Sequence, residues 1–382
     1  MFSSNPPLGL YIHLPWCERK CPYCDFNSHE LQDLPEADYV DALLRDLEGD
    51  LALAQGRTIE TLFIGGGTPS LFSAREIERL LTGVGSLLDL SPELEATMEA
   101  NPGSSEAGKF EGFRAAGINR LSLGIQSFDD RCLQALGRVH NSDQAQAAIE
   151  LARAAGFDNL NIDLMHGLPG QSVTAAEADL RRALALQPSH LSWYQLTIEP
   201  NTVFHKRPPL LPIEDELADI QQLGEAVLAA AGFSQYEVSA YGAPTFRCRH
   251  NLNYWSFGDY LGIGAGAHGK VSYSDGRIER YAKTRQPEAY LAAHSGGFTA
   301  SGQVLSPKDA RGEFMLNALR LNNGFTREQF NVRTGQDASL LEDTLQRFER
   351  ERLLDVEGVQ IKTTELGRRF LDTVVAGFFP DS

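Results

Sequence analysis

Three cysteines stand close together near the start of the chain, in the segment Cys17-Glu-Arg-Lys-Cys21-Pro-Tyr-Cys24. Three thiolates on one short loop can hold three irons of a cubane [4Fe–4S] cluster, whose full protein complement would be four cysteines. The fourth iron then has no protein ligand and can bind an exchangeable molecule. The spacing therefore predicts a [4Fe–4S] cluster held by Cys17, Cys21 and Cys24.

Two other roles for these cysteines must be weighed. Disulfides fit poorly, because three neighbouring cysteines leave one over, and Cys132 and Cys248 lie far away and isolated. A structural zinc ion is the better alternative, because the three cysteines and His29 would make a Cys₃His ligand set.

The spacing CxxxCxxC, with an aromatic residue before the last cysteine, closely resembles that of the radical S-adenosylmethionine (SAM) proteins. SAM carries an amino and a carboxylate group that can chelate the open iron. Its pocket needs close approach of the backbone, a cation for the carboxylate, and acceptors for the amine and the ribose hydroxyls. Gly65-Gly66-Gly67-Thr68-Pro69 supplies the first, because a backbone without Cβ atoms can touch a ligand. Alone, the same string also suits a tight strand-to-helix turn.

The elements that must position these residues alternate between strands and helices up to about residue 240. We expect strands at 8–14, 61–64, 94–99, 120–125, 160–164 and 191–196, with helices between them. The first two helices are expected at 37–53 and from Ser73, where Glu76 would complete a capping box. Such alternation implies βαβ units and a parallel sheet. Six units are too few for an eightfold barrel, so the prediction is an α/β fold with a partial (βα)₆ TIM-like barrel.

Polar residues or glycines follow five consecutive predicted strands. They are the cysteines, the glycine segment, Glu99-Ala-Asn-Pro, Gln126-Ser, and Asp163 with His166. In barrels of this kind the chemistry gathers at the carboxyl ends of the strands. We therefore expect one site at this end of the barrel.

The second half of the chain has a different pattern. Residues 244–305 form a connecting segment that contains His250-Asn-Leu-Asn-Tyr-Trp255 and a glycine-rich stretch at 261–269. Helices are expected at 310–321, 327–332 and 340–351, then a hairpin over 353–362 and a helix over 364–375. This order predicts a smaller C-terminal α+β domain that is winged-helix-like. We divide the chain into a radical SAM barrel at 1–243, the connecting segment at 244–305, and the C-terminal domain at 306–382.

Composition excludes several classes of partner and location. The 382 residues carry a net charge of −17, which disfavours a nucleic-acid partner even though winged-helix relatives often bind DNA. The first seven residues lack the charged and apolar regions of a signal peptide. The sequence has no apolar run of about eighteen residues, so no membrane span is expected. Sparse, unpaired cysteines favour a reducing cytoplasm.

Over nearly all its length the chain resembles the oxygen-independent coproporphyrinogen III dehydrogenases and their relatives, the HemW-type heme chaperones. The matching landmarks are Tyr11-Ile-His-Leu-Pro, the cysteine loop, Gly65–Pro69, Glu99-Ala-Asn-Pro, Gly124-Ile-Gln126-Ser-Phe, Leu136-Gly-Arg138, and Asn161-Ile-Asp163-Leu-Met-His-Gly-Leu-Pro169. The resemblance implies a SAM pocket lined by Tyr11, Gly66, Gly67, Thr68, Glu99, Gln126, Arg138 and Asp163.

The chemistry of these residues suits that assignment. Arg138 can pair with the SAM carboxylate, and Glu99 and Asp163 can accept from hydroxyls or the amine. Taken singly, each carboxylate could equally be a helix cap or part of a surface ion pair.

Two features separate the chain from the dehydrogenases. Their fourth cysteine, two residues after the third, is replaced here by Phe26, which puts decarboxylation of coproporphyrinogen in doubt. The segment starting at His250 resembles the HNxxYW motif of the heme chaperone branch. A histidine is a common axial ligand of heme iron, and Tyr254 and Trp255 offer flat apolar faces to a porphyrin. We expect a heme site at His250, Asn251, Tyr254 and Trp255, with His268 and Cys248 as the next candidate ligands. A buried histidine and ordinary core aromatics are the alternative.

Two functions from different classes remain. In the first, favoured by Phe26 and the HNxxYW segment, the chain binds heme and transfers it to an acceptor protein. In the second, it is a dehydrogenase in which an electron from the cluster cleaves SAM and the resulting radical attacks a porphyrinogen propionate. Flavodoxin or ferredoxin would suit as electron donor, and the oligomeric state, monomer or homodimer, is left open.

Overall fold

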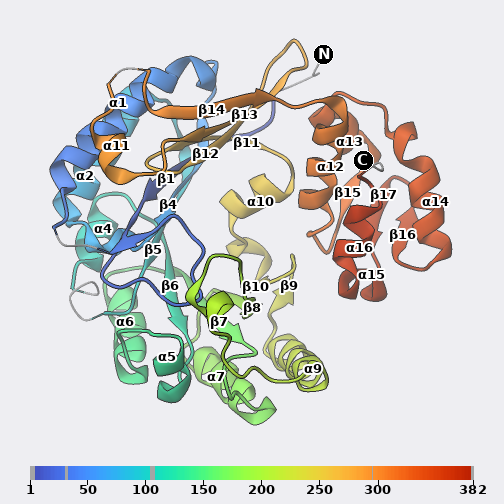
Figure 1. The fold of residues 1–382 in the computed structure, drawn as a ribbon, viewed down its shortest axis with the longest axis horizontal. Helices are drawn as coiled ribbons and strands as arrows, with labels where there is room; N and C mark the ends of the chain where they lie inside the picture. The colour runs from blue at the N-terminus through green and yellow to red at the C-terminus, as the bar shows by residue number, and fades with distance from the viewer. Residues whose placement is uncertain (1–4, 31–32, 104–107, 295, 380–382) are drawn as a thin grey trace.

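The computed structural model describes residues 5–30, 33–103, 108–294 and 296–379. Residues 1–4, part of the segment judged for a signal peptide, lie outside the described residues, as do the last three residues of the chain. Figure 1 shows a curved sheet with helices along its outer side and a group of C-terminal helices set to one side of it. None of the helices in the described ranges is long and apolar enough to span a bilayer.

Six parallel strands form the barrel, in the spatial order β1, β4, β5, β6, β7 and β8. They span Leu8–Leu14, Ile59–Gly66, Leu90–Ala100, Arg120–Gln126, Asn159–His166 and His190–Gln195. The helices that connect and cover them are α1 (Glu36–Ala54), α2 (Ala74–Leu87), α4 (Phe110–Ala115), α5 (Asp130–Ala135), α6 (Ser142–Ala154), α7 (Val173–Ala185), α8 (Val203–Lys206) and α9 (Glu214–Ala230). The partial (βα)₆ barrel predicted from the sequence is confirmed.

Local sequence explains these elements well. All residues of β1 are buried except the half-buried Tyr11, as expected for a parallel strand covered on both faces. Helix α2 begins where predicted, because the Ser73 hydroxyl accepts from the Glu76 N–H at 3.3 Å. The predicted capping box is only half formed. The Ser73 N–H donates to Glu36 at 2.8 Å, and the Glu76 carboxylate is taken by Arg79.

The segment predicted as a connection adds strands to the same sheet. At one edge β10 (Ala240–Gly242) and the short β9 (Ser234–Gln235) run antiparallel beyond β8. At the other edge β11 (Asp259–Ile263) lies parallel to β1, and β12 (His268–Ser272), β13 (Ile278–Lys283) and β14 (Thr299–Val304) continue it as an antiparallel meander. The glycines concealed these strands from pattern analysis. A Cβ on Gly269 would collide with the ring of Tyr281 on the neighbouring strand.

Helix α10 (Arg249–Trp255) lies between the sheet and the C-terminal helices (Figure 1). Beyond it the chain forms the short helix α11 (Pro287–Leu291) against the meander. The HNxxYW segment is therefore helical and central in the molecule.

The C-terminal part has its own core, around Phe314, Phe330 and Phe348. It contains the helices α12 (Pro307–Ala318), α13 (Arg327–Thr334) and α14 (Glu342–Arg350), and a sheet ordered β15 (Phe325–Thr326), β17 (Gln360–Thr363), β16 (Leu354–Glu357). The helix expected at 364–375 is broken at Phe370 into α15 (Glu365–Arg369) and α16 (Leu371–Ala376). The predicted small α+β domain is thus present.

Candidate functional site

The cysteine loop leaves the carboxyl end of β1 and is fixed at both sides. Two short strands, β2 (Trp16–Cys17) and β3 (His29–Glu30), pair in parallel across its base. Within it, the Cys24 N–H donates to the Cys21 carbonyl at 3.1 Å, which closes a tight turn. The Asn27 amide donates to the carbonyls of Ala265 and Arg285, so the glycine-rich stretch before β12 supports the loop.

The three thiols are free and partly exposed. Burial, followed by the charges of Cys24 and Cys21, raises the pKa of Cys17 to about 11, so the sulfurs act on one another. The pKa of Cys24 is also raised, chiefly by burial. In the part of the chain that the structure describes, no three or more His, Cys, Asp or Glu side chains are gathered closely enough to hold one metal ion. Separate thiols on one half-open loop fit a cluster, in which each cysteine binds a different iron.

A chain of polar contacts encloses the loop. Thr68, buried at the end of β4, bonds to the Cys17 thiol and accepts from the Asn101 amide at 3.0 Å. The Asn101 carbonyl oxygen accepts from Arg138 at 2.6 Å. The other terminal nitrogen of Arg138 lies 3.7 Å from the Cys21 sulfur. Two of the three cysteines are thereby tied to a single buried guanidinium.

The glycine segment also supports the cysteine loop. Gly67 has no room for a side chain, because a Cβ there would press on the backbone carbonyl of Trp16. Its N–H donates to the Leu14 carbonyl at 2.8 Å, and the Thr68 N–H donates to the Trp16 carbonyl at 2.7 Å. The absence of side chains lets the end of β4 hold the start of the cysteine loop.

Two half-buried carboxylates lie behind this turn, Glu99 on β5 and Asp163 on β7. Burial, and next the charge of Asp163, raises the pKa of Glu99 to about 7, while Glu99 accepts from the Gly66 N–H at 3.1 Å. Burial also raises the pKa of Asp163, which accepts from Ser122 at 2.9 Å and from Asn161 at 2.7 Å. Carboxyls with such shifted protonation gather at functional sites.

Tyr11 and Gln126 complete the predicted SAM set. The Tyr11 hydroxyl lies 2.9 Å from a ring nitrogen of His13, and burial raises its pKa well above the usual value. Gln126 ends β6 with a φ of 69°, in the left-handed region, and accepts from the Tyr194 hydroxyl at 2.8 Å. Backbone strain in a residue other than glycine is typical of functional positions. All eight predicted SAM residues therefore lie at or near the carboxyl ends of the barrel strands.

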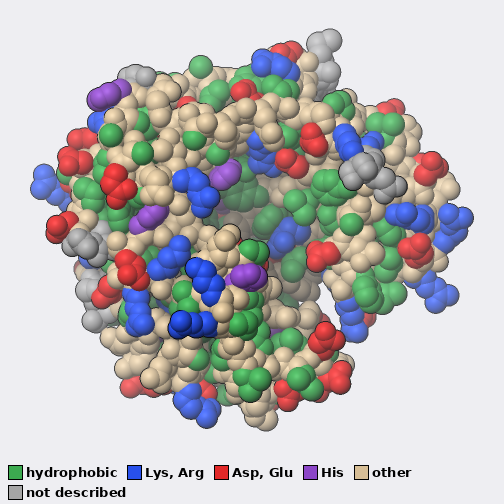
Figure 2. All heavy atoms as spheres, in the orientation of Figure 1, with side chains coloured by type: hydrophobic (Ala, Val, Ile, Leu, Met, Phe, Trp, Pro, Cys, Tyr) green, Lys and Arg blue, Asp and Glu red, His purple; other side chains and the backbone are tan. Residues whose placement is uncertain are grey.

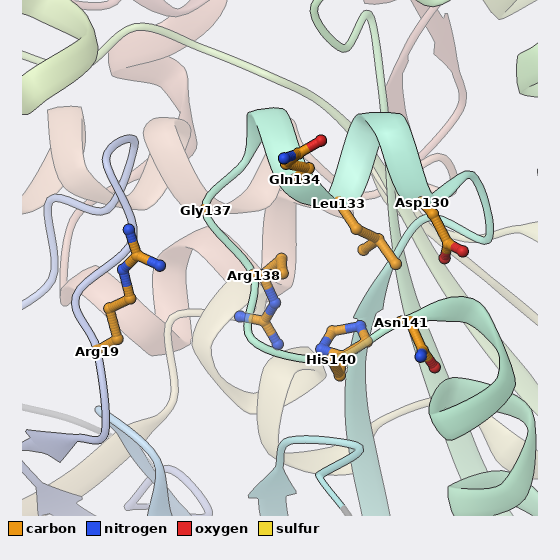
Figure 3. Close-up of a pocket in the computed structure, with 8 residues that line it drawn as sticks. All are labelled: Arg19, Asp130, Leu133, Gln134, Gly137, Arg138, His140 and Asn141. Atoms are coloured by element: carbon orange, nitrogen blue, oxygen red, sulfur yellow. The ribbon is translucent and has the colours of Figure 1, made fainter.

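A cavity of about 310 Å³ opens beside the loop, next to Arg138. Figure 3 shows Arg19 extending from the cysteine loop on one side, and Arg138 and His140 from the connection between α5 and α6 on the other. Burial, and next the charge of Arg138, lowers the pKa of His140 to about 4. Nε of Arg138 is buried and has no hydrogen-bond partner among the described residues. The lining thus carries two arginines, Arg19 and Arg138, against one carboxylate, that of Asp130, and Arg138 has one donor open.

The predicted heme residues lie on α10, and His250 points into the barrel. Its side chain is fully buried, and its ring stacks on Phe63. One ring nitrogen lies 2.8 Å from the Thr61 hydroxyl and the other 2.7 Å from the Tyr254 hydroxyl. Burial, with the charge of Arg120 second, lowers its pKa to about 3. The ring is neutral, and neither nitrogen is open, so the buried histidine weighed from the sequence describes this arrangement.

The other three predicted heme residues differ in their surroundings. Tyr254 lies edge-on to Tyr260, with ring centroids 4.4 Å apart. Trp255 is covered by the Arg320 guanidinium at 4.2 Å, and within the described ranges its buried indole N–H has no partner. Asn251 is half-buried. A porphyrin ligand role for His250 stays a prediction, and it requires the Tyr254 hydroxyl to move away.

Several residues that build both regions were missed. Glu95 on β5 accepts from the backbone N–H groups of Arg249 and His250, each at 3.1 Å, and so caps α10. Asn101 links Thr68 to Arg138, and Thr61 orients His250. Asn101 sits in the Glu99-Ala-Asn-Pro landmark and could have been singled out. Glu95 and Thr61 carry no local signal, because their partners are more than 150 residues away.

Comparison with known proteins first defines the class. The pattern of the Radical SAM superfamily matches residues 11–183, and that of the HemN C-terminal domain matches residues 305–370. A solved structure, coproporphyrinogen III oxidase (HemN) from Escherichia coli, aligns with a TM-score of 0.83 and 24% identity over 98% of this chain and 91% of that chain. At that identity the likeness speaks for the fold.

Closer relatives define the family. The heme chaperone HemW of Escherichia coli is 48% identical over 98% of this chain and 99% of its own length. The heme chaperone HemW of Haemophilus influenzae is 46% identical over 98% of this chain and 99% of its own. The chain belongs to the HemW family of radical SAM proteins.

Proposed function

We propose that this protein is a heme chaperone that binds heme and transfers it to an acceptor protein, on a scaffold that also holds a [4Fe–4S] cluster and SAM. The observation that carries the proposal is the 48% identity, over 98% of the chain, to a relative named as a heme chaperone. The half-open cysteine loop with a buried arginine beside it supports the cluster and SAM.

Cys17, Cys21 and Cys24 would hold the cluster, whose fourth iron binds the amino-acid end of SAM when both are present. Arg138 lies beside Cys21 with an open Nε, which suits a carboxylate next to the cluster. Glu99, with a pKa of about 7, can accept from or donate to the amine and hydroxyls as its protonation requires. Tyr11, Gly66, Gly67, Thr68, Gln126 and Asp163 would complete the pocket.

Arg138→Ala tests the SAM pocket. Binding of SAM should weaken by about 1.5–3 kcal/mol, the contribution of a hydrogen bond to a charged group. Isothermal titration of anaerobic protein measures it, with Arg181→Ala on the exposed face of α7 as the control. Equal SAM affinity in Arg138→Ala and wild type removes Arg138 from the pocket.

For heme we keep His250, Asn251, Tyr254 and Trp255 as the proposed contact region. Wild-type protein mixed with hemin should show a Soret band at about one heme per chain. His250→Ala should shift this band or lower its occupancy if the imidazole exchanges Tyr254 for iron. An unchanged band in the variant places the iron ligand elsewhere, with His268 and Cys248 to be substituted next.

Oxidative decarboxylation of coproporphyrinogen is the competing activity. Phe26 occupies the position of the dehydrogenases' additional cysteine, and its ring is 63% exposed at the edge of the loop. We therefore expect no protoporphyrinogen from coproporphyrinogen with wild-type protein. Robust production of it would replace the chaperone proposal by the enzyme one.

The charge beside the cysteine loop bears on the choice of electron donor. Four basic residues lie at this edge, Arg19 and Lys20 on the loop and Lys206 and Arg207 just after Phe204, which bonds to the loop at Pro22. They outnumber by one the acidic residues of the loop, Glu18, Asp25 and Glu30. That charge suits an acidic electron donor such as flavodoxin or ferredoxin. We place the protein in the cytoplasm, with five free cysteines, and propose no nucleic-acid partner.

We assign the cluster and SAM to residues 1–243, the heme motif to 244–305, and the C-terminal domain to 306–382. A pull-down with and without heme would identify the acceptor, and sedimentation would decide between monomer and homodimer.

A further inference from the structure

A cavity of about 790 Å³ lies at the amino ends of β1 and β4, the opposite end of these strands from the cysteine loop. Its walls come from the segment before β1, the connection between α1 and β4, helix α10, and Arg333 of α13. The volume lies within the range of small-molecule and cofactor sites. The cavity therefore joins the barrel, the motif helix and the C-terminal domain.

Helix α10 has two faces with different surroundings. His250 and Tyr254, four residues apart, point into the barrel and bond to each other. Arg249, Leu252 and Asn253, at the complementary spacing, line the cavity. The helix that carries the HNxxYW residues thus turns its other face to an open volume.

The cavity is positively charged in a protein whose net charge is −17. Its lining contains three arginines, Arg57, Arg249 and Arg333, against one carboxylate, that of Glu60. Arg57 is held by the buried Asp259 at 2.7 Å, and Arg249 meets Glu60 at 3.4 Å, where both are about half exposed. Arg333 makes no hydrogen bond or ion pair with any residue that the structure describes, and burial lowers its pKa while the charge of Asp259 raises it. Asp259 also pairs with Arg57 and Lys270, so an anionic ligand would balance the remaining positive charge.

The rest of the lining is mixed. Apolar Pro6, Pro7, Leu8 and Leu252 alternate with the uncharged polar side chains of Asn5, Thr58, Thr61, Asn253 and Ser256. One hydroxyl connects it to the motif histidine, because Thr61 lines the cavity and lies 2.8 Å from the His250 ring. A small inorganic anion would leave this volume unfilled, whereas a flat macrocycle with two carboxylates would use both the apolar and the cationic walls. Figure 2 shows hydrophobic and basic side chains bordering the hollow between the barrel and the C-terminal helices, so this part of the molecule combines the two kinds of surface.

We propose that this cavity binds the heme, with its two propionates at Arg249 and Arg333 and the macrocycle against the outer face of α10. The inference rests on the proposed heme function and adds its location and the groups that recognise the carboxylates. His250, on the inner face of the same helix, contacts Thr61 of the cavity wall and Tyr254.

The test compares hemin with hemin dimethyl ester, whose propionates carry no charge, on the full chain. Arg249→Gln and Arg333→Gln should each raise the Kd for hemin about tenfold, the effect of one hydrogen bond to a charged group. The Kd for the ester should stay the same in both variants. Arg181→Gln, an exposed arginine on α7, is the matched control. Ser256→Trp, which fills the cavity without removing charge, should weaken both ligands.

The outcomes separate this inference from the proposed function. A wild-type protein that shows no Soret band overturns both. Normal hemin binding in Arg249→Gln, Arg333→Gln and Ser256→Trp overturns the cavity while heme binding stands. An equal loss for hemin and its ester in the arginine variants also overturns it, because the loss then does not come from the carboxylates. Thermal melting of each variant shows whether it is folded.

Discussion

The two ends of the barrel strands treat their polar groups differently. At the carboxyl ends, the thiols of the cysteine loop are half exposed, Nε of Arg138 has no partner among the described residues, and Glu99 sits in an environment that raises its pKa to about 7. Around α10, both nitrogens of His250 are bonded and both oxygens of Glu95 accept from the helix N-terminus, and of the motif residues Trp255 alone has a buried polar atom without a partner in the described ranges.

We expect buried polar groups without a partner to bind a ligand, and fully bonded ones to stabilise the fold. Buried polar groups are almost always satisfied, so one that is not needs an explanation. The open donor at Arg138 has one if SAM binds there. Both nitrogens of His250 are bonded, so a heme iron at this residue would have to replace the hydroxyl of Tyr254.

The largest effect is expected from removing the cysteines of the loop. Cys17→Ala, Cys21→Ala and Cys24→Ala should each abolish the cluster, because three cysteines already leave one iron without a protein ligand. Wild type, prepared anaerobically, should contain about four irons per chain and each variant close to none. Iron and sulfide analysis, with EPR of the reduced protein, measures the loss.

Cys248→Ala is the matched control, since Cys248 is a free, buried cysteine at the start of α10 and not on the loop. It should keep full iron content. If any one of the three loop variants also keeps it, that cysteine is not a ligand.

The second prediction concerns Glu95, whose carboxylate caps α10. Glu95→Ala should destabilise the protein by about 3–5 kcal/mol, because it leaves two amides of α10 uncapped and removes a negative charge that acts on the buried Arg120. Urea unfolding measures the change. Glu93→Ala, two residues away and exposed, should alter stability by less than about 0.5 kcal/mol. Equal stability of the two variants would contradict a structural role for this cap.

The sequence predicted the first kind of region far better than the second. The cysteine loop, glycine segment and strand ends are short patterns, and strand β1 was predicted at the bounds it has. The bonds of α10 run from Glu95 and Thr61, 155 and 189 residues away from His250, so no local pattern contains them. The strands β11–β14 were not predicted for another reason. Their glycines are required by close neighbours, such as the ring of Tyr281 against Gly269, and glycines weaken any strand pattern.

The third prediction concerns how the protonation of Glu99 makes the stability of the protein depend on pH. The pKa of Glu99 is about 7, against 4.5 for an ordinary glutamate, so the folded state holds this proton more tightly than the unfolded chain does. Stability from this group is therefore full below about pH 4.5 and is lost as pH rises toward 7. The loss amounts to about 3 kcal/mol. Glu99→Gln should remove this loss. The free energy of unfolding of the variant, measured in urea, should therefore rise relative to that of wild type between pH 5 and 8.

Glu93→Gln, which changes an exposed carboxylate, should leave the wild-type pH dependence intact. A Glu99→Gln protein whose stability changes with pH as wild type does would show that Glu99 is ionised at pH 5 and is not held as an acid.

The smallest effect is expected at the backbone that supports the cysteine loop. Two glycine substitutions should change the stability of the protein in opposite directions. Gly67→Ala should destabilise the protein by about 1–3 kcal/mol, because its Cβ would press on the Trp16 carbonyl and move the start of the loop. Gly49→Ala, on the exposed face of α1 with no atom near its Cβ, should stabilise by about 0.5–1 kcal/mol. Thermal melting ranks the two, and iron content should fall in Gly67→Ala alone. If Gly67→Ala melts like wild type and holds its iron, the end of β4 does not fix the loop, and contact with SAM is the remaining role of this segment.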